Sequence, residues 1–245
     1  MENKRGTLYG IGVGPGDPDL VTLRAVKVLG QVDRVFAAAS TKNHHSLAMS
    51  IARPHIPDAT PVELLHFPMT RDRSETRRAW AANARRIVAE LEAGRDAAFL
   101  TLGDSLTYST FGYLMAHVKA AAPHVQVLTV PGITSYQAAA SRLNTTLVEG
   151  EGSLMVVSGA MGGDRLRSLA DKPDTVVFLK AYRNLEDICA ALEESGEYPY
   201  CVAVKNCGHP TEEIVVNLEE LCRQKPDYWT LVIAKKNSPL EPTSE

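Results

Sequence analysis

Short apolar segments alternate with amphipathic segments along most of the chain. The runs at 7–13, 35–39 and 97–102 consist mainly of small and apolar residues, as buried strands do. Between residues 74 and 94, apolar residues recur at spacings of three and four, which predicts a helix with one buried face that ends at Gly94. Strands that alternate with helices are typical of βαβ units, so the pattern predicts an α/β protein with a mostly parallel sheet.

A second half with the same alternation begins near residues 120–124. A short edge strand, expected to be antiparallel, occupies 213–216, and the polar tail at 237–245 is expected to fray. Thr22 is placed to cap a helix over 23–29, and Pro54 to stop a helix over 46–53. Further strands are expected at 61–67, 125–130, 154–157, 175–179, 201–205 and 230–234, and further helices at 111–119, 136–142, 184–192 and 218–224.

The composition is that of an ordinary globular protein. The 245 residues include 26 Lys and Arg against 29 Asp and Glu, a net charge of −3, which argues against a dedicated nucleic-acid binder. No segment approaches the ~18 apolar residues of a membrane span, and the first residues carry no apolar leader. No C-x-x-C pair supports a metal or redox motif, so we expect a soluble cytoplasmic protein with reduced thiols at Cys189, Cys201, Cys207 and Cys222.

The densest group of glycines lies at 10–18, directly after the first expected strand. Its four glycines stand at every second position, so the dinucleotide fingerprint G-x-G-x-x-G is not met. Pro15 and Pro18 interrupt the helix that such a site requires, and Asp17 would repel a pyrophosphate. We interpret the segment as a rigid loop at the carboxyl end of a strand, where α/β folds bind ligands; the alternative is a tight connection with no ligand.

Two more glycine turns follow strands in the same way. The turn at 102–110 contains Gly103, which permits close approach of the backbone, followed by several hydrogen-bonding side chains. The turn can bind a ligand, and Ser109 or Thr110 can cap the helix that follows it. These two roles are compatible, because a cap does not occupy the whole loop. The turn at 130–135 precedes a helix that Thr134 or Ser135 could cap, or whose free N–H groups could meet a ligand.

Together these turns resemble the motifs of the tetrapyrrole methyltransferase family, whose members use S-adenosylmethionine. The family pattern G-x-G-P-G-D-P-x-L-x-T-L-x-A is met at 12–25, and P-G-I-[ST]-[SA] at 131–135. The G-D-P-x-x-Y/F loop is met at 103–108, except that Ser105 replaces the proline and loosens the backbone. The resemblance spans 6–235. Stretches at 7–12, 66–70, 94–103 and 108–111 are most similar to the branch that methylates carbon 20 of precorrin-2 or cobalt-factor II in cobalamin biosynthesis.

The resemblance implies a tetrapyrrole methylase fold of two α/β domains, residues 1–120 and 121–245, with the cofactor in the cleft between them. It also implies a homodimer that acts on a tetrapyrrole, with no nucleic-acid or membrane partner. Carried over by position, the cofactor contacts in the first part of the chain are Pro15, Leu102, Gly103, Asp104, Thr107, Thr134 and Ser135. Leu179, Ala203 and Thr230 are added from strand ends in the C-terminal domain.

The methyl transfer that the resemblance implies requires no nucleophile from the protein. The methyl sulfonium is already electrophilic and the ring carbon is electron-rich, so the protein mainly holds the two in line. Asp104 is the first candidate for a functional carboxylate; the alternative is a carboxylate bonded to local backbone amides. Tyr108 could stack near the substrate or pack in the first domain.

Cationic residues are expected near the carboxylate rim of a tetrapyrrole. Arginine is suited to carboxylates, and six lie at 71–86, although a solvated helix face is the alternative: Arg71, Arg73, Arg77, Arg78, Arg85 and Arg86. The loop that contains Lys42, His44 and His45 could cover the site. Contact of its histidines with a cobalt held by the substrate is the less favoured alternative, because adjacent histidines in a loop usually lie on the surface. We expect Cys207 to be a buried structural thiol.

Two other functions remain compatible with these residues. One keeps the chemistry and changes the substrate to another corrin position or to uroporphyrinogen. The other is a non-catalytic regulatory module that binds S-adenosylmethionine, which Ser105 in the second motif favours. A nucleotide-dependent dehydrogenase is disfavoured because the phosphate fingerprint is broken.

Overall fold

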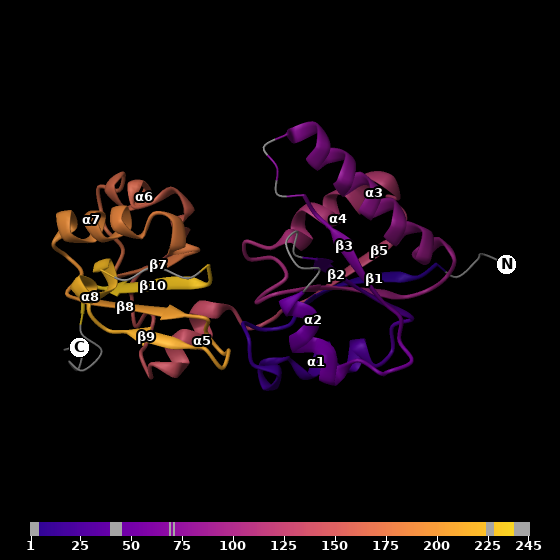
Figure 1. Cartoon of the computed structure of the whole chain (residues 1–245), viewed down its shortest axis with the longest axis horizontal. Helices are drawn as coiled ribbons and strands as arrows, with labels where there is room; N and C mark the ends of the chain where they lie inside the picture. The colour runs from indigo at the N-terminus through magenta and orange to yellow at the C-terminus, as the bar shows by residue number, and fades with distance from the viewer. Residues whose placement is uncertain (1–4, 40–45, 69, 71, 224–227, 238–245) are drawn as a thin grey trace. The chain divides into compact units, whose positions relative to one another are not determined.

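The computed structural model describes residues 5–39, 46–68, 70, 72–223 and 228–237. The chain forms two compact units, Met1–Thr134 and Ser135–Glu245 (Figure 1). This boundary lies beyond the expected one at residue 120, because strand β5 (Gln126–Val130) pairs with β1 (Thr7–Gly12) and so joins the first sheet. The pattern of apolar residues marks a strand but does not tell which sheet it enters.

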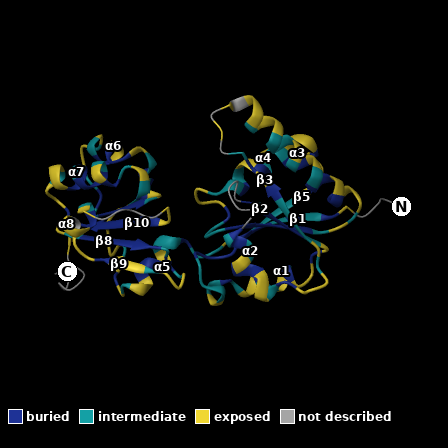
Figure 2. Cartoon of the chain, viewed as in Figure 1, coloured by how far each residue is buried: buried dark blue, intermediate teal, exposed yellow. Residues whose placement is uncertain are grey.

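The first unit is built on a parallel five-stranded sheet, as the alternating pattern predicts. Its other strands are β2 (Arg34–Ala39), β3 (Val62–His66) and β4 (Ala97–Thr101), and the order is β3-β2-β4-β1-β5. All four pairings are parallel. Every residue of β4 is buried, as expected of a central strand with both faces covered. In Figure 2 the strands are mostly buried or intermediate, and the exposed residues lie mainly on helices and loops.

Helices cover both faces of this sheet and give it two cores. Helices α3 (Arg73–Glu92) and α4 (Thr110–Ala121) pack on one face, and α1 (Leu23–Leu29) and α2 (Leu47–Ala52) on the other (Figure 1). Thr22 caps α1 as predicted, and Ser109 caps α4. The cap of α3 is Asp72, two residues before the expected start. The described residues of this unit also contain two short 3-10 helices, at Pro18–Leu20 and Arg53–His55.

The second unit has a mixed sheet, which corrects the expectation of mostly parallel strands. Its order is β6-β7-β10-β8-β9, and only β6 and β7 are parallel. The last strand enters between β7 and β8 and runs opposite to both, a direction that buried apolar runs do not encode. The edge strand β9 is antiparallel, as predicted. The strands are β6 (Leu154–Ser158), β7 (Thr175–Leu179), β8 (Tyr200–Lys205), β9 (Glu213–Val215) and β10 (Thr230–Lys235).

In the described part of the second unit, four α-helices surround the sheet. They are α5 (Ser135–Arg142), α6 (Asp164–Arg167), α7 (Leu185–Ser195) and α8 (Leu218–Arg223), with 3-10 turns at Gly159–Met161 and Ala181–Arg183. Among the described residues no helix is both long and apolar enough to cross a membrane.

The cysteines differ in part from the expectation of four reduced thiols. Cys189 and Cys222 form a disulfide, with a Cα–Cα distance of 6.1 Å. Helices α7 and α8 pack against each other and bring the two residues together across 33 positions of sequence, which spacing alone does not reveal. Cys201 and Cys207 are free and buried, and burial raises the pKa of Cys201 to about 12 and that of Cys207 to about 11. Cys207 is therefore a buried thiol, as expected.

Candidate functional site

The three glycine turns meet at one edge of the first sheet. They follow β1, β4 and β5, which are neighbours in the sheet and end at the same edge because all three are parallel. The first two turns are also paired directly: Gly103 N donates to Gly14 O at 2.7 Å, and Gly14 N donates to Gly103 O at 3.2 Å. Segments that are far apart in sequence therefore form one continuous backbone surface.

Glycine is required where these turns touch. A β-carbon on Gly12 would lie 2.6 Å from the carbonyl oxygen of Gly103, and one on Gly132 only 2.2 Å from the same oxygen. Gly103 itself has φ +68°, and its free side is open, with only the carbonyl oxygen of Ile133 within 4 Å, at 3.9 Å. The close backbone contacts thus lie at Gly12 and Gly132, while the predicted approach of a ligand to Gly103 stays a prediction for which its open side leaves space.

The carboxylate of Asp104 ties the second turn to the third. One oxygen accepts from Leu106 N (2.9 Å), Thr107 N (3.0 Å) and the Thr107 hydroxyl (3.1 Å), and the other accepts from Gly132 N (3.1 Å). Burial opposes ionisation, but the amides of Leu106 and Gly132 and the Thr107 groups outweigh it and lower the pKa. Asp104 thus makes the local backbone bonds that the sequence left open as the alternative, and Thr107 is bonded to it.

Ser105, the departure from the family motif, is buried and bonded. Its hydroxyl donates to the carbonyl oxygen of Val130, the last residue of β5, at 3.3 Å. A proline at this position has no side-chain donor, so the bond is an anchor that the usual residue cannot make. The loop is consequently held in place, which removes the one feature that favoured a degenerate, non-catalytic module. The sequence pattern does not reveal this bond, because its acceptor is a backbone atom 25 residues away.

The other predicted residues of the first unit differ in exposure. Pro15 is buried, Leu102 is half-buried, and Tyr108 is exposed with φ +50°. Tyr108 therefore does not pack in the interior of the first unit. Thr134 is buried and Ser135 is the first residue of α5.

The donor set of these turns suits an adenosyl ligand better than a dinucleotide. Asp17 uses its carboxylate to accept from Asp19 N at 2.9 Å and so caps the short helix after β1, where a pyrophosphate would have to bind. What the turns offer is backbone groups and the open side of Gly103, with Thr134 and Ser135 at the end of the third turn. Such groups can hold a nucleoside and an amino-acid tail without a phosphate clamp.

The three candidates in the second unit do not all lie at strand ends. Leu179 ends β7 and Thr230 begins β10, and because these strands are antiparallel the two residues belong to the same sheet edge. Thr230 is buried and lies opposite Lys205 of β8. Ala203 is a correction: it lies inside β8, paired with both Val232 and Val215, and is fully buried.

The arginines divide into two groups. Arg86 pairs with Glu63 and Glu90, so it belongs to a structural ion network instead of a substrate surface. Arg77, Arg78 and Arg85 are exposed on α3 and form no ion pair with any residue that the structure describes. Arg71 and the loop with Lys42, His44 and His45 lie outside the described residues, as does the side chain of Arg73.

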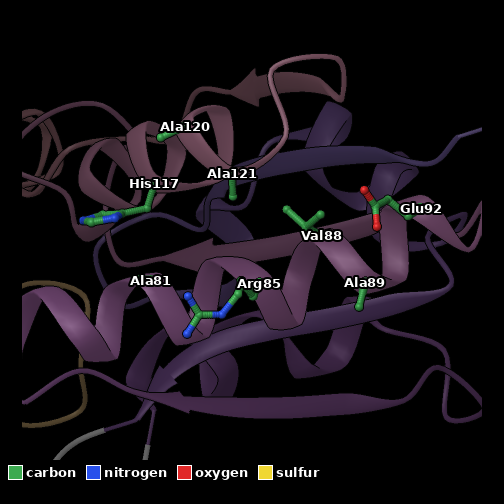
Figure 3. A pocket seen from close by; sticks show the side chains of 8 residues that line it. All are labelled: Ala81, Arg85, Val88, Ala89, Glu92, His117, Ala120 and Ala121. Atoms are coloured by element: carbon green, nitrogen blue, oxygen red, sulfur yellow. The ribbon is translucent and has the colours of Figure 1, made fainter.

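A groove between α3 and α4 was not predicted from sequence. It has a volume of about 650 Å³, and small side chains form most of its lining: Ala81, Arg85, Val88, Ala89, Glu92, His117, Ala120 and Ala121 (Figure 3). It begins about two turns into α4, away from the glycine turns at the helix start. It is therefore distinct from the candidate cofactor site. No group of His, Cys, Asp and Glu within the described part of the chain could hold a metal ion.

Comparisons with known proteins agree with this arrangement. A model of the family described as tetrapyrrole (corrin/porphyrin) methylases matches residues 7–222. The chain is 33% identical over 232 residues to the cobalt-precorrin-2 C(20)-methyltransferase of Salmonella typhimurium, covering 94% of this chain and 97% of that protein. It is 34% identical over 241 residues to the precorrin-2 C(20)-methyltransferase of Sinorhizobium sp, covering 93% and 94%. A cobalamin synthesis related protein (CobF) of Corynebacterium diphtheriae shares the fold, with a TM-score of 0.75 at 20% identity over 95% and 99% of the two chains.

Proposed function

The chain belongs to the tetrapyrrole methylase family, and we propose that it transfers a methyl group from S-adenosylmethionine to carbon 20 of a precorrin-2-type ring in cobalamin biosynthesis. The observation that carries this proposal is the similarity to C(20)-methyltransferases along more than nine-tenths of both chains. The junction of the three turns supports it, because the junction offers an open backbone surface without a phosphate clamp.

The residues proposed to hold the cofactor lie in both units. In the first they are Pro15, Leu102, Gly103 and Thr134, and the second unit begins with the next of them, Ser135, the first residue of α5. The further proposed contacts in the second unit are Leu179 and Thr230, at one edge of its sheet. When bound, S-adenosylmethionine supplies a methyl group on a positively charged sulfur.

The protein's own contribution is positional. Asp104 and Ser105 hold the second turn against the third, so that the backbone around Gly103 is ordered before the ligand arrives. Such preorganisation of two reactants is worth up to roughly 7–11 kcal/mol in favourable systems. We assign Asp104 to positioning, and Tyr108, whose ring is exposed beside the turn, to contact with the substrate.

The exposed arginines of α3 are proposed to receive the carboxylates of the ring. Helix α3 follows β3, so its first turns lie at the edge of the sheet where the glycine turns end. Arg77 and Arg78 are in those first turns and have no described acidic partner. A guanidinium pairs with a carboxylate through two parallel hydrogen bonds, which favours correct orientation of an anionic ring.

A labelled-methyl assay tests the proposal. The chain is incubated with S-adenosylmethionine carrying a ¹³C-methyl group and, in separate arms, with metal-free precorrin-2, its cobalt complex and uroporphyrinogen. We expect label at carbon 20 in one or both precorrin arms, and the preferred arm shows whether the substrate already holds cobalt. Label at another carbon, or only in the uroporphyrinogen arm, would contradict the proposal.

Two further properties follow from the resemblance. We propose a homodimer and a cytoplasmic location, as is usual for biosynthetic enzymes of this family. Sedimentation equilibrium should give twice the mass of the chain, and a monomer at micromolar concentration would contradict the first statement. Cell fractionation tests the second.

A further inference from the structure

Aromatic side chains gather on the surface of the second unit, close to two candidate cofactor contacts. The ring centroids of Tyr182 and Tyr228 are 4.7 Å apart, and those of Tyr228 and Trp229 are 4.6 Å apart. Tyr228 and Trp229 each remain 44% exposed. The guanidinium of Arg183 lies 5.4 Å from the centroid of the Tyr182 ring. We call these four residues the aromatic patch.

The position of the aromatic patch follows from the sheet. Trp229 directly precedes Thr230, the first residue of β10, and Tyr182 follows Leu179, the last residue of β7, by three positions. Since β7 and β10 are antiparallel neighbours, the end of one and the start of the other lie at one edge (Figure 1). The aromatic patch is therefore continuous with the edge that carries Leu179 and Thr230.

The side chains of the aromatic patch indicate the chemistry of the ligand that it would bind. Large aromatic side chains left half-exposed in a group mark a binding surface more often than chance, and their faces suit a flat conjugated ring. Arg183 is exposed and forms no ion pair with any described residue, so its charge is available to an anion. A ligand that satisfies both features is conjugated and carries carboxylates.

We propose that the aromatic patch is a subsite for the tetrapyrrole substrate, in which the rings contact the macrocycle and Arg183 binds a peripheral carboxylate. This inference rests on the proposed function and specifies how the second unit takes part in it. The tetrapyrrole is favoured over the cofactor because the cofactor has a single carboxylate, at the opposite end of the molecule from adenine. Adenine stacked on these rings would leave Arg183, 5.4 Å from the Tyr182 ring, without an anion to bind.

Four variants test the subsite: Trp229→Leu, Trp229→Phe, Arg183→Gln and, as a matched control, Tyr113→Ala. Tyr113 is an aromatic residue on α4 that is 71% exposed and has no part in the proposed site. For each variant the KM for the tetrapyrrole, kcat and the Kd for S-adenosylhomocysteine are measured. Trp229→Leu and Arg183→Gln should each raise the tetrapyrrole KM by about 3- to 10-fold, the range for one lost ring contact or one lost ion pair.

The remaining measurements distinguish the loss of a substrate subsite from a general disturbance of the protein. The Kd for S-adenosylhomocysteine should stay within twofold in all four variants. Trp229→Phe keeps an aromatic face and should therefore raise the KM less than Trp229→Leu does, and Tyr113→Ala should retain the wild-type KM. An unchanged KM in Trp229→Leu and Arg183→Gln would overturn the proposal. A parallel rise in the Kd for S-adenosylhomocysteine would also overturn it, because the aromatic patch would then cover the cofactor.

Failure of the proposed function is distinguishable from failure of the subsite. If wild-type protein methylates no tetrapyrrole, the proposed function fails, and an absorption titration with the metal-free ring then gives a Kd in place of KM. A Kd that the Trp229→Leu and Arg183→Gln changes raise would still support the subsite. A Kd that they leave unchanged, or no binding to wild type, would overturn it.

Discussion

Gly132 is the residue whose replacement tests the junction of the three turns most severely. A β-carbon there would lie 2.2 Å from the carbonyl oxygen of Gly103 and 2.6 Å from the carbonyl carbon of Gly12. Both neighbours are backbone atoms held by strand pairing, so an added methyl group must displace them instead of rotating away. Overpacking usually costs about 1–3 kcal/mol, and two backbone clashes place Gly132→Ala near the upper end of that range.

Gly112 offers a matched control for this substitution. It lies inside α4, and a β-carbon there would meet nothing within 4 Å. Gly112→Ala should stabilise the protein by roughly 0.5–1 kcal/mol, because glycine is unfavourable within a helix. Urea unfolding measures the stability of both variants, and isothermal titration measures their affinity for S-adenosylhomocysteine.

The two glycine variants should differ from each other in both stability and affinity for S-adenosylhomocysteine. Gly132→Ala should unfold at lower urea and bind S-adenosylhomocysteine at least about tenfold more weakly, since a displaced turn loses 1.4 kcal/mol or more of binding free energy. Gly112→Ala should bind as wild type does. Wild-type stability and affinity in Gly132→Ala would refute the idea that backbone contact between the turns shapes the site.

Three more predictions follow from the structure. Asp104→Ala removes a charged acceptor from the part-buried amide of Gly132 and from the exposed amides of Leu106 and Thr107. Hydrogen bonds to a charged group contribute about 1.5–3 kcal/mol, and less where water can replace them, so methylation and S-adenosylhomocysteine binding should fall while Asp104→Asn loses less. Equal turnover in wild type and Asp104→Ala would remove the residue from the site. Arg77→Glu combined with Arg78→Glu should raise the tetrapyrrole KM more than the cofactor KM, and an equal rise would indicate general damage. The Arg95 hydrogen bond, aided by Arg86 and Arg34 against the effect of burial, lowers the pKa of Glu90 from 4.5 to about 2. The carboxylate thus stabilises the fold above pH 4.5 by at most about 3 kcal/mol and loses this as pH falls toward 2, so urea unfolding of Glu90→Gln should differ from wild type at pH 7 and converge at low pH.

The first unit was largely predictable because its signals are local. Thr22 marks the start of α1, the apolar run at 97–101 marks a buried strand, and the three glycine turns follow strands as ligand loops do. Parallel strands carry these turns to a common edge, so their meeting could be inferred from order alone.

What the sequence did not reveal depends on contacts between distant residues. The direction of β10 and the Cys189–Cys222 bond are set by how elements pack, which periodicity does not encode. Arg86 looked like its neighbours on α3 until Glu63 and Glu90 were seen to pair with it. Tyr228 and Trp229 carried one usable signal, their position directly before Thr230.

The claim on which the rest depends is that the glycine turns of the first unit bind the cofactor, and a crystal structure with S-adenosylhomocysteine tests it most directly. We expect electron density for S-adenosylhomocysteine against the backbone of Gly103 and the side chains of Pro15 and Thr134. Density confined to the groove between α3 and α4, or at any surface away from these turns, would contradict it.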